Sequence, residues 1–227
     1  MVRGRNGTLL LISGVRLATF NGVFSGGREA DSTEIDRLAG ILAAEGLPWS
    51  IQVRGEPTGE VLDVAGRYGR HQRFVEPLMG CRREEARFRG AARGSGTLAV
   101  RVVRSDQQKV YAELLGAGFE APADPFHDLM SGPLLDAPWG TAYLGDVDGV
   151  PVGAGYGIRI GDEIGVFNIA VVPEFRGRGY GRLITERVLA DGFAAGARSA
   201  YLQPSEAGLP LYESMGFRTL ENWTYLA

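Results

Sequence analysis

The sequence predicts an α/β protein with a mostly antiparallel sheet flanked by helices, and with a second, smaller α/β domain at the N-terminus. The composition, with 227 residues of which 44% are hydrophobic and 22% charged, is that of a packed soluble protein. Apolar strand-like and helix-like segments alternate in both halves. The charge also changes sign: residues 1–95 carry 14 arginines against 11 acidic residues, whereas residues 96–227 carry 10 basic against 16 acidic residues.

Composition also excludes several classes of protein. The single cysteine, Cys81, cannot form an internal disulfide, so a disulfide-stapled secreted fold is excluded. No apolar run approaches the ~18 residues of a membrane-spanning helix. The run from Leu9 to Ile12 is broken by Ser13, which also argues against a signal peptide. We therefore expect a cytoplasmic protein that does not contact a membrane.

The polar stretch at residues 82–96 ends in Gly-Ser-Gly, a flexible composition, and it coincides with the change in charge. It predicts a boundary between an N-terminal domain, residues 1–94, and a second domain, residues 95–227.

The expected elements follow from hydrophobic periodicity and from glycine and proline punctuation. In the first half we expect strands at 8–12, 50–54 and 73–79, and helices at 31–45 and 59–68. In the second half we expect helices at 107–115, 126–135, 183–195 and 209–215. Gly116 and Gly118 are expected to stop the first of these helices. Strands are expected at 98–103, 141–145, 150–160, 164–172, 200–203 and 218–226. The second and third of these form a hairpin through an Asp-Gly turn, and the near-continuous apolar run at 164–172 predicts a strand buried on both faces.

One segment predicts chemistry. The run RGRGYG at residues 176–181 follows the apolar strand and opens a helix. Glycines let the backbone approach a ligand closely, and unpaired N–H groups at a helix start favour an anion. Arg176 and Arg178 add positive charge. The pattern predicts a pyrophosphate cradle. A P-loop is excluded because Gly-Lys-Ser/Thr is missing, and the spacing G-x-G-x-G differs from the dinucleotide fingerprint.

Three segments in order resemble the GNAT superfamily of N-acetyltransferases. Residues 176–181 resemble its R/Q-x-x-G-x-G/A signature, with the lead-in AVVPEF at 170–175. Residues 211–217, LYESMGF, resemble its L-Y-x-x-x-G-F segment, and the hairpin at 145–153 also fits. The resemblance covers residues ~96–227. The first half permits a degenerate copy of the same fold.

The resemblance implies acetyl-CoA as cosubstrate and assigns roles to particular residues. Tyr212 falls on the tyrosine that protonates the leaving thiolate in many members. Backbone groups of the strand before the cradle would pair with pantetheine and polarise the thioester carbonyl. The expected cofactor-binding residues are Ile169, Ala170, Val171, Val172, Arg176, Gly177, Arg178, Gly179, Tyr180, Gly181, Arg182 and Ser205.

The sequence departs from the family pattern at two places. Ser205 stands where many members have an asparagine that contacts CoA. Residues 165–172 contain no carboxylate to serve as general base; Asn168 could orient a water but cannot accept a proton as a carboxylate does.

These features predict an acetyl-CoA-dependent N-acetyltransferase acting on a small amine, without metal. Two histidines and one cysteine far apart do not match zinc-ligand spacing. The alternative is a non-catalytic acyl-CoA sensor or interaction module. A nucleic-acid binder using the arginines of residues 67–93 is disfavoured by the net charge of −3. The expected partners are acetyl-CoA and the amine; a homodimer stays open.

Overall fold

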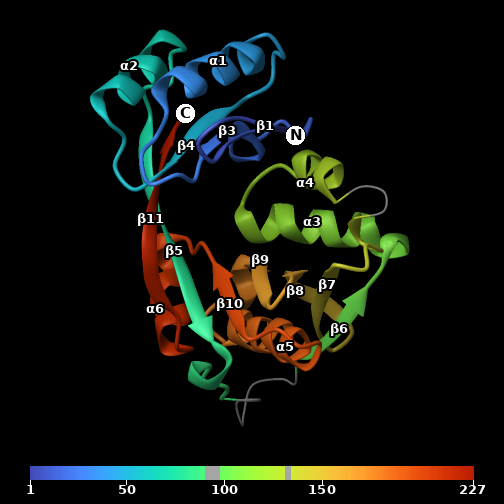
Figure 1. The fold of residues 1–227 in the computed structure, drawn as a ribbon. Coiled ribbons are helices and arrows are strands. Elements are labelled where there is room, and N and C mark those ends of the chain that lie inside the picture. Colours follow the sequence, from blue (N-terminus) through green and yellow to red (C-terminus); the bar gives the residue numbers. More distant parts are fainter. Residues whose placement is uncertain (90–97, 131–133) are drawn as a thin grey trace. The chain divides into compact units, whose positions relative to one another are not determined.

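The computed structural model describes residues 1–89, 98–130 and 134–227 (Figure 1). The chain forms two compact units: Met1–Leu78 together with Thr219–Ala227, and Met79–Arg218. The predicted boundary between residues 94 and 95 lies outside the described residues. The C-terminal residues belong to the first unit because their strand pairs with residues 51–54, a long-range pairing that no local pattern announces.

The first unit is a sheet with two helices. Its strands follow the order β1-β2-β3-β4-β11-β5. Helix α1 buries Ile35, Leu38 and Leu42, which recur at helical spacing, and the Asp31 side chain caps its start by accepting from the Glu34 N–H. The elements are β1 (Val2–Arg3), β2 (Thr8–Ile12), β3 (Asn21–Ser25), α1 (Ser32–Ala43), β4 (Ser50–Arg54), α2 (Gly59–Arg67) and β11 (Arg218–Leu226), and β5 (Arg73–Arg82) has residues in both units.

In the second unit the strand order is β5-β10-β9-β8-β7-β6, and among its described strands only the β9–β10 pair is parallel. The elements are β6 (Ala99–Val103), α3 (Gln108–Phe119), α4 (Asp124–Leu129), β7 (Gly140–Val147), β8 (Val150–Ile160), β9 (Glu163–Val171), α5 (Tyr180–Ala194), β10 (Ser199–Leu202) and α6 (Leu209–Ser214). The mixed, mostly antiparallel sheet confirms the predicted fold class.

Helices cover both faces of this second sheet (Figure 1). Val188 and Leu189 of α5 pack with Ile164 and Val166 of β9 on one face. On the other face, Ala112 and Leu115 of α3 lie in a core with Ala154 and Ala170. The β7–β8 hairpin turns through Asp148 and Gly149, which have φ of 51° and 79° as a type I′ turn requires, and this confirms the predicted hairpin.

The predicted end of α3 was wrong. The helix continues through Gly116 and Gly118 to Phe119 and ends at Glu120, which is left-handed with φ of 54°. Gly118 serves packing instead: a Cβ there would lie 2.7 Å from the Cβ of Ala170. The missing side chain therefore lets α3 lie close on β9.

The prediction that β9 is buried on both faces was also wrong. Phe167 is 36% exposed, and Asn168 has φ of 53°. Ala154 pairs with Ala170 but Tyr156 with Phe167, so Gly155 alone faces two residues and the strand contains a β-bulge. The extra residue reverses the alternation of side chains, which explains why Val166 faces α5 while Ala170 faces α3.

Candidate active site

The predicted cradle lies at the start of α5. The 3-10 helix η5 (Pro173–Phe175) follows β9, and residues 176–179 then lead into the helix. The first i to i−4 backbone bond of α5 runs from Leu183 N to Gly179 O, at 3.1 Å. Among the described residues, no hydrogen-bond partner is present for the backbone N–H groups of 177, 178, 179, 181 and 182. These donors and the helix dipole favour an anion.

Glycine is required at two of these positions by backbone conformation. Gly177 and Gly179 have φ of 73° and 81°, which side-chain-bearing residues rarely adopt. A Cβ built at either residue would have no neighbouring heavy atom within 4 Å. The glycines therefore present an open face of backbone, and the start of α5 carries no side-chain cap that would occupy it.

Arg176 is held by the protein. Its guanidinium donates to Val171 O at 3.1 Å, to Gly118 O at 2.7 Å and to Glu120 Oε1 at 2.6 Å. Its charge is thus paired with Glu120, and the side chain ties the turn to β9 and to the end of α3. Gly118 and Glu120 are parts of the site that the sequence reasoning missed.

The other two arginines behave differently from one another. Arg178 is exposed, whereas Arg182 is buried. The Arg178 guanidinium donates to Glu174 O at 3.1 Å and lies 4.9 Å from the centroid of the Phe175 ring. The Arg182 guanidinium donates to Glu186 at 2.9 Å and to the Ser214 hydroxyl at 2.7 Å. Of Arg182, only the backbone N–H remains available to a ligand. Tyr180 is 2% exposed, so its ring is core.

The edge of β9 beside the cradle is open. Pairing of β9 with β10 ends at Gly165 and Tyr201, whereas β9 continues to Val171. The Val172 N–H donates to Val152 O of β8 at 3.0 Å, so that donor is occupied. Because successive residues of a strand turn their backbone groups to opposite edges, Val171 turns its N–H and C=O away from β8. On that edge the Val171 carbonyl accepts from the Arg176 guanidinium. Ile169 lies two residues earlier on the same edge. Ala170 is buried against α3.

Tyr212 lies on α6, next to α5. It is 8% exposed, and its ring meets Phe217 edge-on with centroids 5.9 Å apart. Burial raises the pKa of Tyr212 to about 12, partly offset by a hydrogen bond with the Thr185 side chain. Thr185 in turn donates to Gly181 O at 2.8 Å, which links the tyrosine to the cradle helix.

Ser205 caps η6 (Glu206–Gly208), and its hydroxyl accepts from the Gly208 N–H at 3.3 Å. Asn168, at the bulge, donates to the Met130 sulfur at 3.8 Å and hydrogen-bonds with Tyr111, whose hydroxyl donates to Gly155 O at 2.8 Å. Asn168 is therefore fixed on the face of β9 that α3 covers.

Outside this site, several arginines of the predicted basic group have local partners. Arg67 pairs with Asp36 at 2.8 Å, Arg73 pairs with Glu56, and Arg70 lies over Trp49. Arg93 lies outside the described residues. No helix within the described parts of the chain has the length and apolar character to cross a membrane, and no group of three metal-binding side chains is found there.

Comparison with a protein-family model shows to which family the chain belongs. The model of the acetyltransferase (GNAT) family matches residues 104–217, half of the chain. The chain belongs to the GNAT family. A curated relative, the ribosomal protein bS18-alanine N-acetyltransferase of Salmonella typhimurium, is 39% identical over 59 residues, which are 25% of this GNAT chain. The match spans 40% of that relative's length.

Two solved structures resemble this GNAT protein over most of their length. A GCN5-related N-acetyltransferase from Kribbella flavida has a TM-score of 0.66 and 20% identity, covering 93% of this chain and 82% of that one. A conserved protein of unknown function from Staphylococcus epidermidis has a TM-score of 0.68 and 14% identity, covering 99% and 92%. At these identities the likeness shows the fold.

Proposed function

We propose that the protein transfers the acetyl group of acetyl-CoA to the amine of a small molecule. The observation that carries the proposal is the row of unpaired backbone N–H groups at the start of α5, in a chain whose residues 104–217 match the GNAT family. Those donors suit the pyrophosphate of CoA. The N–H of Val171 and the backbone of Ile169, on the open edge of β9, would hold the pantetheine arm and the thioester carbonyl.

The proposed reaction is direct transfer. The neutral amine nitrogen attacks the thioester carbonyl carbon, the C–N bond forms, and the C–S bond breaks. Tyr212 donates its proton to the departing sulfur, and the proton lost by the amine passes to water. A tyrosine whose pKa is about 12 stays protonated at neutral pH, as this role requires.

A small, cationic acceptor is favoured by charge. Residues 96–227 carry six more acidic than basic residues, which attracts a protonated amine. The name of the Salmonella relative gives a second class, an N-terminal alanine of a protein. The lack of a carboxylate in residues 165–172 favours a different function, an acyl-CoA sensor without turnover.

An assay of free CoA release from acetyl-CoA separates these functions. The panel contains small diamines and aminoglycosides, neutral monoamines, and a short peptide beginning with alanine. We expect at least one small cationic amine to release CoA well above hydrolysis and to yield its acetylated product by mass spectrometry. If only the peptide were acetylated, the acceptor would be a protein N-terminus and not a small molecule. Tight CoA binding without turnover on any amine would favour the sensor.

A further inference from the structure

A second cavity lies in the Met79–Arg218 unit, at the opposite end of α5 from the cradle. Its volume is about 130 Å³, the share of roughly four waters. Helix α5 has 15 residues, so this end lies roughly 20 Å from the cradle. The lining comes from the start of β7, from β8 and β9, and from the last turn of α5, and it includes Trp139, Tyr143, Arg159 and Asp191.

Arg159 offers an unused cation to this cavity. Among the described residues its guanidinium has no acidic partner. It lies at the C-terminal end of α5, where a would-be Cβ of Gly196 is 3.7 Å from its Nη2. The helix dipole favours a cation at this end of α5. Because no acidic side chain pairs with the guanidinium, its N–H donors can bind the carboxylate of a ligand in a bidentate manner.

Asp191 supplies the opposite charge. Its Oδ2 accepts from the Tyr143 hydroxyl at 3.1 Å and from Arg187 Nε at 2.8 Å. Both of these bonds go to Oδ2, and Oδ1 accepts none from the described residues. Tyr143 is 2% exposed and its pKa is raised by burial and by Asp191, so its hydroxyl stays a donor that fixes the carboxylate.

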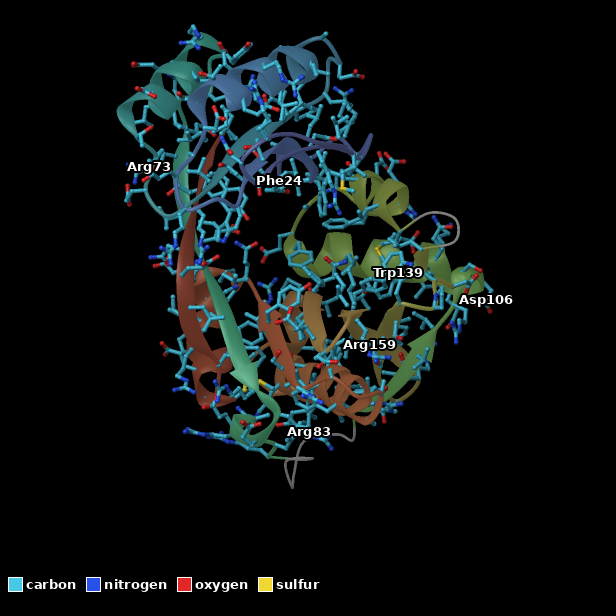
Figure 2. The ribbon with its side chains drawn as sticks, in the orientation of Figure 1. Phe24, Arg73, Arg83, Asp106, Trp139 and Arg159 are labelled. Atoms are coloured by element: carbon cyan, nitrogen blue, oxygen red, sulfur yellow. The ribbon has the colours of Figure 1, made fainter. Side chains whose placement is uncertain are left out.

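Trp139 supplies the apolar surface. It precedes β7 and remains 47% exposed although it lines the cavity, and its backbone carbonyl accepts from the Arg159 backbone N–H at 2.8 Å. Figure 2 labels both residues. An indole beside a cation and a carboxylate matches a small molecule that carries a carboxylate, an ammonium and an apolar chain.

We propose that this cavity binds a free α-amino acid with a small apolar side chain, as a ligand separate from the acetyl-transfer site. The ligand's carboxylate pairs with Arg159, its ammonium with Asp191 Oδ1, and its side chain packs on Trp139. The proposal does not depend on the proposed activity.

Calorimetry of the full-length protein with L-leucine tests the proposal, in the presence of saturating CoA. We expect saturable binding of one leucine per chain. We also expect at least about tenfold weaker binding of 4-methylpentanoate and of 3-methylbutylamine, which lack the ammonium and the carboxylate respectively. Arg159→Gln and Trp139→Ala should each weaken leucine at least about fivefold, whereas Arg198→Gln, at an exposed arginine that does not line the cavity, should not.

Asp191→Asn provides a further test, because it keeps the shape of the side chain and removes its charge. It should weaken leucine but leave the affinity for 4-methylpentanoate unchanged. No saturable leucine binding, or leucine binding that survives both Arg159→Gln and Trp139→Ala in folded proteins, would overturn the proposal. Equal weakening of leucine and 4-methylpentanoate by Asp191→Asn would overturn the assignment of the ammonium.

Discussion

Whether Tyr212 is catalytic or only part of the core depends on the role of its hydroxyl group. Tyr212 is almost fully buried, so its ring contributes to the core whatever its role, and only the hydroxyl can be tested without disturbing packing. Tyr212→Phe removes that hydroxyl and its bond with Thr185. We expect kcat to fall at least about tenfold, with CoA affinity nearly unchanged, because general acid catalysis contributes about 100- to 10,000-fold.

Tyr156→Phe is the matched control. It removes another buried hydroxyl of the same unit, which donates to Leu134 O at 2.9 Å, and it should leave kcat unchanged. Steady-state kinetics with the chemical step shown to be rate-limiting measure both variants. An unchanged kcat in Tyr212→Phe would assign the residue to packing alone, and an equal loss of CoA affinity would make it a binding residue.

The pKa of Tyr212 also predicts the pH dependence of the reaction. Burial raises this pKa from 10.0 to about 12, so the protonated, donating form persists at every lower pH. The wild-type kcat should therefore show no alkaline decrease due to Tyr212 between about pH 7 and pH 10. A decrease in this range that disappears in Tyr212→Phe would contradict the raised pKa.

At the scale of elements, the start of α5 makes the sharpest prediction about the donor. Gly179→Asp places a carboxylate on the open backbone face where the pyrophosphate is proposed to lie. No neighbouring atom lies within 4 Å of the added Cβ, so charge rather than collision is tested. Gly179→Asn, which has the same shape and, like Asp, is among the residues found at positive φ, is the control.

We expect Gly179→Asp to weaken CoA at least about tenfold by calorimetry, and Gly179→Asn to weaken it much less. Undiminished CoA binding by a folded Gly179→Asp protein would show that the phosphates lie elsewhere.

Glu34 makes a prediction about the first unit. Its carboxylate is 1% exposed, accepts from the Arg5 N–H at 3.2 Å, and receives two bonds from Arg37 at 2.7 and 2.9 Å. The hydrogen bonds from Arg37 lower its pKa from 4.5 to about 2. A lowered carboxyl pKa stabilises the fold above the unfolded value and loses that contribution as the pH falls through the folded value.

Glu34→Gln should therefore be less stable than wild type at neutral pH, and the difference should shrink as the pH falls from about 5 to about 2. Urea midpoints followed by circular dichroism measure this, with Glu45→Gln, exposed just beyond the same helix, as the control. A difference that stays constant across this range would contradict the lowered pKa.

Elements whose signals are local could be predicted from the sequence, and those that depend on a distant partner could not. The helix capped by Asp31 and the Asp-Gly hairpin are determined by residues that are adjacent in the sequence. The short strand β3 was missed because its five residues acquire strand character from pairing with β2 and β4. Gly118 was read as a helix stop because its packing partner, Ala170, lies 52 positions away.

The same distinction holds within the candidate site. The glycine spacing and Tyr212 follow from motifs in the sequence. The pairing of Arg176 with Glu120, and the bulge at Asn168, arise from contacts between α3, β9 and the cradle turn, so neither could be predicted from the local sequence. Arg182 was expected at the cofactor, but the structure shows its guanidinium held by Glu186 and Ser214.

At the scale of the whole molecule, the units do not follow simple cuts in the sequence. Residues 79–82 of β5 pair with residues 199–202 of β10, so the second unit needs a strand that precedes residue 95. Met79 and Cys81 on this strand are buried in one core with Ala200 and Leu202. Residues 223–226 instead pair with β4 in the first unit.

A fragment of residues 79–218 should therefore fold better than one of residues 95–227. Removing residues 79–82 uncovers the edge of β10 and leaves the backbone groups of β10 that face β5 without partners, a cost of about 1 kcal/mol or more for each lost hydrogen bond. Keeping residues 219–227 adds a strand whose two neighbours in the sheet, β4 and β5, are missing. We expect the fragment 79–218 to show a cooperative thermal transition and CoA affinity within about tenfold of the full chain, and the fragment 95–227 to show neither. Circular dichroism and calorimetry on both fragments measure this, and equal folding and CoA binding by the fragment 95–227 would show that β5 is dispensable to the cradle.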